Sequence, residues 1–91
     1  MIIRQAKIND LKKIFDIEKR VFIIPWSNQS IKNELNRASC SINIIGEKNN
    51  NLIAYCFSHI IDKEIHILRL AIDVQYQHKG IGKEFFSLIL L

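Results

Sequence analysis

The spacing of apolar residues changes in the middle of this chain, and the change restricts the folds that it can adopt. Between about residues 11 and 37, apolar residues recur every three or four positions, as on one face of a helix. From residue 39 to about residue 72 they fall into runs with a period of two, separated by short turns, as in strands. Strands joined by short turns pair antiparallel, because a parallel connection needs a crossover of a dozen residues or more. The pattern therefore predicts an α+β fold with a mostly antiparallel sheet.

Capping and turn residues place the individual elements. We expect a strand over 2–6, a helix over 11–22 that Asn9 or Asp10 caps, and a helix over 28–37 that follows Pro25 and is capped by Ser27. Further strands are expected over 41–45, 52–61 and 64–72, with turns over 46–51 and 62–63, then a loop over 73–79 and a helix over 80–91. The order is β-α-α-β-β-β-α, with helices on both faces of the sheet. Because the segment 64–72 is apolar on both faces, we expect it to be a central strand covered on both sides.

The composition is typical of one soluble domain. Hydrophobic residues make up 48% of the chain and charged residues 24%, and no apolar run reaches the ~18 residues that a membrane span needs. The N-terminal residues lack the basic-then-apolar plan of a signal peptide. We therefore expect a cytoplasmic protein with no membrane partner.

The net charge of +4 raises the alternative of a small basic RNA-binding module. The adjacent basic pairs, Lys12-Lys13 and Lys19-Arg20, lie among acids in an expected helix, as on a solvated face. Aromatic and basic residues do not alternate as they do on base-stacking surfaces. RNA binding is therefore the weakest interpretation, and we expect no direct nucleic-acid contact.

The two cysteines, Cys40 and Cys56, are expected in neighbouring strands. In a cytoplasmic protein, buried free thiols are the ordinary outcome. Neither cysteine has metal-ligand spacing to another cysteine or to a histidine, so no metal is expected.

The stretch Gln77-His78-Lys79-Gly80-Ile81-Gly82 lies just before the last expected helix. The N-terminus of a helix exposes unpaired N–H groups, and residues without side chains let an anion approach them. Lys79 and Lys83 place positive charge beside the glycines, and His78 can donate a hydrogen bond. A pyrophosphate is therefore the expected ligand. The alternative is a flexible turn, since two glycines alone are a weak signal. The stretch is neither a phosphate-binding loop of the Walker type nor the dinucleotide fingerprint, whose third glycine position holds Phe85.

The strand "RLAID" followed by "VQYQHKGIGKEF" resembles motif A of the GCN5-related N-acetyltransferase (GNAT) family. That motif is a central strand, then Gln/Arg-x-x-Gly-x-Gly/Ala, then a helix. The order of elements is similar to the family's over the whole chain. With the tripeptide Pro25-Trp26-Ser27, the chain looks most like the ribosomal-protein-alanine N-acetyltransferase branch.

The resemblance implies that acetyl-CoA is bound, as a substrate and without a metal. Backbone groups at the end of the strand would pair with its pantetheine arm, and backbone amides of the loop would hold its pyrophosphate. The implied residues are Leu70, Ala71 and Ile72 in the strand and His78, Lys79, Gly80, Ile81, Gly82 and Lys83 in the loop, with Gln77 opening the motif.

The resemblance also implies a further strand with a carboxylate base, and a helix with a tyrosine acid, beyond the helix that follows motif A. We therefore expect residues 1–91 to form a partial N-acetyltransferase domain, truncated before its C-terminal strands and helix, and the catalytic residues are unknown. His66, expected on the same face as Leu70, could act as a base, but it is more typical of a core or groove histidine, and His59 has no stronger claim. Glu18 is either near the edge of an apolar helix stripe or a contact of the substrate amine. Trp26 is either a packing residue or part of a substrate loop.

Three functions remain open at this point. The first is transfer of acetyl to an N-terminal amine, that of a ribosomal protein's alanine, with the catalytic half missing from this chain. The second is an inactive truncated remnant of such an enzyme, and the third is the RNA-binding module. The almost wholly apolar segment 85–91 also predicts self-association through the last helix.

Overall fold

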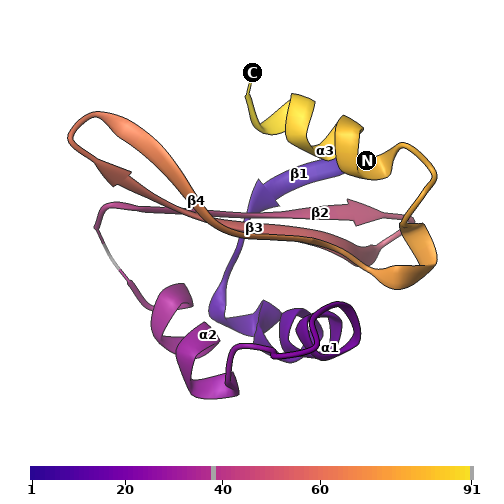
Figure 1. The fold of residues 1–91 in the computed structure, drawn as a ribbon, viewed down its shortest axis with the longest axis horizontal. Helices are drawn as coiled ribbons and strands as arrows, with labels where there is room; N and C mark the ends of the chain where they lie inside the picture. Colours follow the sequence, from indigo (N-terminus) through magenta and orange to yellow (C-terminus); the bar gives the residue numbers. More distant parts are fainter. Residues whose placement is uncertain (38, 91) are drawn as a thin grey trace.

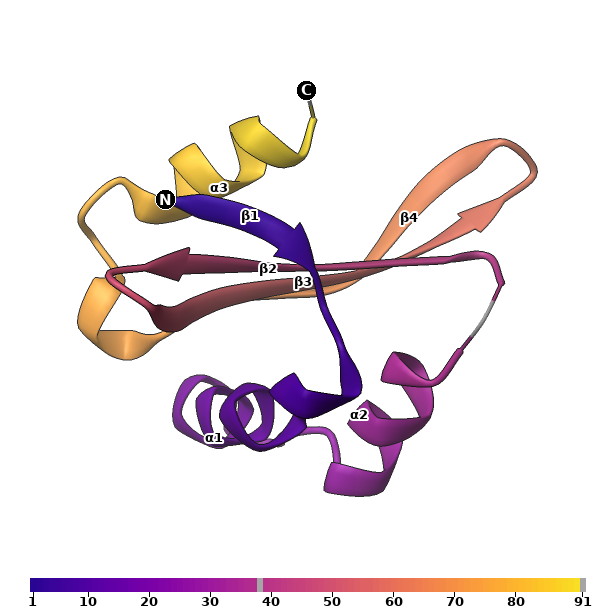
Figure 2. The same ribbon diagram turned by 180° about the vertical axis from the view of Figure 1, so that it is seen from behind.

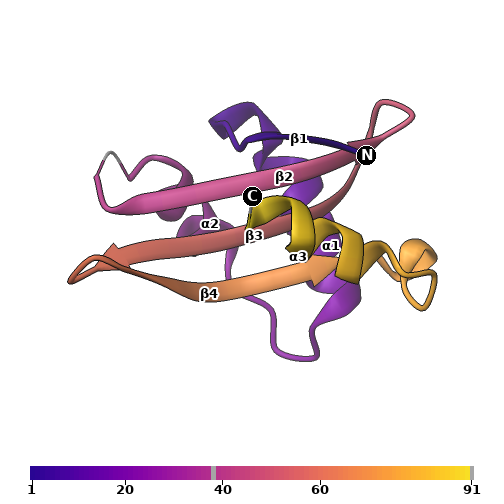
Figure 3. The same ribbon diagram turned by 90° about the horizontal axis from the view of Figure 1, so that it is seen from above.

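The computed structural model describes residues 1–37 and 39–90, and over these residues it shows one four-stranded antiparallel sheet between helices (Figures 1 and 2). The elements are β1 (Ile2–Gln5), the 3-10 turn η1 (Ile8–Asp10), α1 (Leu11–Val21), α2 (Asn28–Leu35), β2 (Ser41–Lys48), β3 (Asn51–Ile61), β4 (Glu64–Ile72), the 3-10 turn η2 (Val74–Tyr76) and α3 (Ile81–Ile89). The predicted order and the α+β class are confirmed. The strands lie side by side in the order β1-β2-β3-β4 (Figure 3).

A hydrophobic core lies on each face of the sheet. α1 and α2 cover one face and α3 covers the other (Figure 1). On the α1 and α2 side, Ile14, Ile17 and Ile31 pack against Tyr55 and Phe57 of β3. Ile53, Ala54, Cys56, Ile81 and Phe85 form the core on the α3 side. Successive residues of a strand point to opposite faces, so β3 supplies both cores.

β2 continues through the segment that was expected to be a turn. The structure places only Asn49 and Asn50 in the turn, both at positive φ, and a bulge lies between Gly46 and Glu47. Gly46 is a packing glycine: a Cβ there would lie 2.8 Å from Met1 Sδ and 3.1 Å from the Phe85 ring. The expected turn over 46–51 was therefore too long, because this glycine admits α3 onto the sheet and does not end a strand.

The prediction that the segment 64–72 forms a central strand was wrong for the part of the chain that the structure describes. β2 and β3 hold the inner positions, and β3 has seven consecutive buried residues over 52–58, while β4 pairs with β3 alone. Ile65, Ile67 and Leu68 in the first half of β4 are 41–63% exposed. The apolar residues on both faces of β4 are therefore less buried than the sequence pattern predicted.

The described helices end slightly earlier than expected. α2 ends at Leu35, and α3 begins at Ile81, with Gly80 as its N-cap, and ends at Ile89. Phe85 of α3 is fully buried, whereas Phe86 and Leu90 are exposed. Leu91, the last residue of the expected helix, lies outside the described residues. Among the helices described, none is long and apolar enough to cross a membrane.

Both cysteines are free thiols, as expected, but only one of them is buried. Cys56 lies in the core of the α3 side, and burial raises the pKa of its thiol to about 11. Cys40 is exposed, ahead of β2, and its carbonyl accepts a hydrogen bond from the amide of Ile60. The expectation that Cys40 is buried was therefore wrong. The strand partner of Cys56 is Ile44 of β2, four residues after Cys40.

Candidate functional site

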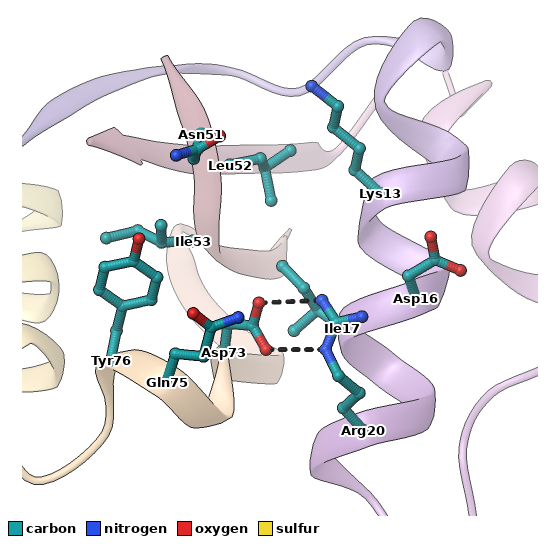
Figure 4. A pocket seen from close by; sticks show the side chains of 10 residues that line it. All are labelled: Lys13, Asp16, Ile17, Arg20, Asn51, Leu52, Ile53, Asp73, Gln75 and Tyr76. Carbon is teal, nitrogen blue, oxygen red and sulfur yellow. Dashed lines mark hydrogen bonds and ion pairs between the residues drawn. The ribbon is translucent and has the colours of Figure 1, made fainter. Parts of the chain in front are cut away.

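The loop between β4 and α3 is attached to the rest of the chain at its beginning. The buried carboxylate of Asp73 accepts hydrogen bonds from Nε and Nη2 of Arg20 on α1, each at 2.9 Å (Figure 4). The same carboxylate accepts from the amide of Val74 at 2.8 Å. Gln77, the first residue of the motif, donates from Nε2 to the carbonyl of Ile72 at 2.9 Å. These bonds hold the path of the chain as it leaves β4.

Beyond Gln77 the backbone amides of residues 78–83 have no acceptor among the described residues. Gln77 N still bonds to the carbonyl of Val74, and the next amide with a partner is Glu84 N, which donates to Gly80 O at 3.1 Å. No side chain caps α3. The unpaired amides of residues 78–83 therefore lie at the positive end of the helix dipole, and this arrangement stabilises an anion.

The two glycines of this loop differ in backbone conformation and in surroundings. Gly80 has φ +77°, in the left-handed region that favours glycine, and a Cβ there would have no atom within 4 Å. A Cβ on Gly82 would meet Ile72 Cγ1 at 3.6 Å, an ordinary contact. Packing within the chain therefore requires neither glycine to be small, and the space over the loop is open. His78, Lys79 and Lys83 are exposed at its rim.

The end of β4 brings the predicted strand residues next to this loop. Leu70 and Ile72 pack on the α3 side, and Ala71 packs on the α1 side. Among the described residues β4 pairs only with β3, so its opposite edge presents unpaired backbone groups beside the loop. The structure thus brings the predicted strand and loop residues together at one end of β4.

His66 lies on the face opposite to Leu70, in contrast to the prediction. A bulge shifts the register between Phe57 and Ser58: Phe57 pairs with Arg69, but Ser58 pairs with Ile67. Because Leu68 is an extra residue in β4, the side chains of the residues before it point to the opposite face from the one that strict alternation predicts. His66 therefore pairs with His59 and lies on the same face of the sheet as His59. The sequence pattern of alternating residues could not show this bulge.

Glu18 is fully buried, which the sequence reading missed. Its carboxylate accepts hydrogen bonds from the Tyr55 hydroxyl, from the guanidinium of Arg69 and from the amide of Trp26. Burial alone would raise the pKa of Glu18, but these donors outweigh it and hold the pKa below its ordinary value. Both expectations for Glu18 were wrong, since it lies neither at the edge of a stripe nor open to a substrate amine. The signal was present in the sequence: a glutamate within an apolar stripe requires a buried cation as its partner.

A second buried carboxylate joins α2 to the sheet. Oε1 of Glu34 lies 2.9 Å from Nε2 of His59, and Oε2 accepts from the hydroxyl of Ser41 and the amide group of Asn43. Burial would raise the pKa of Glu34, and these partners lower it below the ordinary value. His59 is therefore a tethered histidine between α2 and β3, consistent with the simpler of its two interpretations.

Of two cavities among the described residues, one lies beside the loop and the other lies next to α2. A cavity of about 270 Å³ is formed by α1, the start of β3 and the turn η2 (Figure 4). It reaches the loop through Asp73, Gln75 and Tyr76, and residues 78–83 lie outside it. A second cavity of about 330 Å³ is lined by Trp26 and by the α2 side chains that face it. Among the described residues, no group of three or more His, Cys, Asp or Glu side chains could hold a metal ion.

Comparisons with known proteins agree with this geometry. Residues 11–89 match the model of the acetyltransferase (GNAT) family. A curated relative, the [ribosomal protein bS18]-alanine N-acetyltransferase of Haemophilus influenzae, is 28% identical over 82 residues, covering 90% of this chain and 55% of the relative. The crystal structure of the ribosomal-protein-S18-alanine N-acetyltransferase from Escherichia coli superposes with a TM-score of 0.87 at 23% identity, covering 97% of this chain and 56% of the other.

The PaiA N-acetyltransferase from Thermoplasma acidophilum, solved in complex with coenzyme A, superposes with a TM-score of 0.82 at 21% identity, covering 97% of this chain and 68% of the other. The chain spans about half the length of the curated relatives it matches. Since the family model matches most of the chain, and the solved relatives share its fold, the chain belongs to the acetyltransferase (GNAT) family.

Proposed function

We propose that this chain is the N-terminal part of an N-acetyltransferase domain and binds acetyl-CoA at the end of β4. The observation that carries the proposal is the run of unpaired amides over residues 78–83, at the N-terminus of α3. A pyrophosphate would accept hydrogen bonds from these amides and would lie at the positive end of the helix dipole. Gly80 and Gly82 leave room for it, and Lys79 and Lys83 add positive charge at the rim.

The pantetheine arm would lie along the free edge of β4. Backbone groups of Leu70, Ala71 and Ile72 would pair with its amide groups, as a neighbouring strand would. Gln77 would act indirectly, because its side chain holds the carbonyl of Ile72 and so sets the angle between strand and loop. Apart from that of Gln77, these roles use the backbone, which explains why the motif needs glycines more than reactive side chains.

For the whole domain we propose transfer of the acetyl group to the N-terminal amine of a ribosomal protein. The neutral amine attacks the thioester carbonyl, the new C–N bond forms as the C–S bond breaks, and the coenzyme leaves as its thiolate. The amine loses one proton to a base, and the thiolate gains one from an acid. The names of the curated relatives support this acceptor, an N-terminal alanine.

A second candidate is a chain that binds the coenzyme without turning it over. Its support is that the polar groups near β4 are already engaged: Glu18 is enclosed by its own donors, and His66 faces away from Leu70. Neither is therefore placed to take a proton from an amine at the strand end. RNA binding has less support, because Arg4, Arg20 and Arg69 each pair with a carboxylate of this chain.

Calorimetric titration with acetyl-CoA tests the proposal. Gly82→Glu places a carboxylate among the amides, and we expect it to weaken binding at least about tenfold by repelling the pyrophosphate. Ser87→Glu is the matched control, since it adds the same charge to an exposed position of the same helix, and its affinity should equal that of the unmodified chain.

Equal affinity for folded Gly82→Glu and for the unmodified chain would contradict the site. If the chain binds, an acetylation assay with a ribosomal N-terminal peptide then separates the two candidates. Transfer from acetyl-CoA would support the enzyme, and saturable binding without transfer would support the chain that only binds.

A further inference from the structure

The buried carboxylate of Glu18 joins three parts of the fold at one point. Its donors come from the loop after α1, from β3 and from β4, through Trp26 N at 2.8 Å, the Tyr55 hydroxyl and Arg69. Glu18 itself is on α1 and is 0% exposed. A charge in such a place is stable only when its partners are fixed, because desolvation is otherwise costly. The network is therefore a rigid connection between the loop and the sheet.

Arg69 contacts the loop of residues 22–27 at several points, and Trp26 of this loop also stacks on Phe57 of β3, with 5.8 Å between the ring centroids. Its guanidinium carbon lies 3.5 Å from the centre of the Phe22 ring and 5.3 Å from that of Trp26. Its Nη2 also donates to the carbonyl of Ile24 at 3.3 Å. Ile23 is 100% and Ile24 84% exposed, so the tip of this loop has no apolar anchorage of its own. A planar guanidinium can stack on a ring with its face and donate hydrogen bonds from its edge, a geometry that a lysine does not have.

Arg69 also occupies a special place on β4. It directly follows the bulged Leu68 and directly precedes Leu70, Ala71 and Ile72, the strand end beside the free amides of the loop. The bulge and the ion pair therefore act on the same segment of backbone. Arg69 therefore connects that strand end to Trp26 directly.

We propose that Arg69, with Glu18 as its counter-ion, is a positioning residue that holds the loop of residues 22–27 against the coenzyme-binding end of β4. This inference rests on the proposed function. Arg69 itself touches neither coenzyme nor acceptor: it fixes the relative position of the strand that holds the thioester and the loop at its side. Occupancy of the strand end by acetyl-CoA is thereby reported at Trp26.

Trp26 is the single tryptophan of the chain, so its fluorescence reads this connection directly. Arg69→Met alone would leave Glu18 buried without a counter-ion and could prevent folding. The double variant Glu18→Gln/Arg69→Met removes both charges and keeps an amide at position 18 that can still bond to Trp26 N and to Tyr55. Arg20→Met/Asp73→Asn is the matched control, because it removes both charges of another arginine–carboxylate pair of α1 that does not contact Trp26.

The first measurement is quenching of Trp26 by acrylamide, without ligand. We expect the quenching constant to rise at least about twofold in the Glu18→Gln/Arg69→Met variant, because the loop opens locally, and to stay unchanged in Arg20→Met/Asp73→Asn. Circular dichroism must show all the chains folded. An unchanged constant in the folded double variant would overturn the proposal.

The second measurement is a titration with acetyl-CoA, followed by calorimetry and by Trp26 emission. In the unmodified chain both signals should saturate together. In the double variant calorimetric binding should persist and the Trp26 response should disappear, which a merely structural role would not produce. A Trp26 response that persists in the double variant, or binding to the unmodified chain with no response, would refute the coupling. If the unmodified chain shows no binding, the proposed function fails for it, and the quenching result still decides whether Arg69 holds the loop.

Discussion

Gly80 and Gly82 should respond to alanine with opposite changes in stability, although they are two residues apart. At Gly80 a methyl group would meet no atom within 4 Å, so steric contact contributes nothing. The cost is that of placing alanine at φ +77°, about 1 kcal/mol of unfolding free energy. In a domain of this size that loss lowers the melting temperature by roughly 4–8 °C.

At Gly82 the same change should stabilise the chain. The residue lies in the first turn of α3, and the added Cβ would contact Ile72 Cγ1 at 3.6 Å without displacing it. Alanine is favoured over glycine in a helix by up to about 1 kcal/mol, and we expect about half of this value so close to the helix end. The melting temperature should therefore rise by a few degrees.

Urea unfolding followed by circular dichroism measures both effects. Gly80→Asn is the matched control, because asparagine tolerates the left-handed region better than alanine does and should recover part of the loss. The reasoning would be refuted by a Gly80→Ala variant as stable as the unmodified chain. It would also be refuted by a Gly82→Ala variant less stable than that chain. Either result would mean that the amides of residues 78–83 are not arranged as described.

Three further outcomes are expected. Glu18 and Glu34 have pKa values below the ordinary 4.5, so the stability that they contribute is present above that pH and is lost as the pH falls below it; urea midpoints measured against pH should show this loss, and Glu34→Gln should flatten it. Phe57→Ala leaves a cavity in the core between the sheet and α1 and α2, and it should lower the free energy of unfolding by about 3–5 kcal/mol. Thermal melting should then show a largely unfolded chain, and a loss under about 1 kcal/mol would contradict the packing. A thiol reagent should label Cys40 in the folded chain and Cys56 only after denaturation, and rapid labelling of both in the native state would be incompatible with the buried position of Cys56.

Much of the fold can be predicted from residues that lie close together in the sequence. Ser27 was expected to cap a helix, and its hydroxyl accepts from Ser30 N at 3.1 Å. Asp10, a candidate cap of α1, instead accepts from Lys7 N and from Arg4, so it caps the short turn before that helix. Capping, turns and periodicity depend on neighbours a few positions away, which is why such signals give the elements and their order but can miss a boundary by a turn.

Part of the candidate site could likewise be predicted from the sequence, and part could not. The loop Gln77–Gly82 could be located from the sequence, because glycines before a helix have a local meaning for an anion. The pairing of Glu18 with Arg69, which are 51 positions apart, could not be predicted, because any of the four arginines of this chain could have met that carboxylate. The side of β4 that His66 faces was also hidden, since a bulge is set by the register with the neighbouring strand.

The sequence by itself determined the family motif, the antiparallel hairpins and the cap of α2 at Ser27. Only the tertiary structure decided that β3 and not β4 is central among the described strands, that Gly46 admits α3, and that Arg69 reaches across to the loop after α1. The reason is physical: the backbone preferences of a residue act over a turn or two, whereas a buried charge or a close approach is settled by whichever distant segment comes to lie against it.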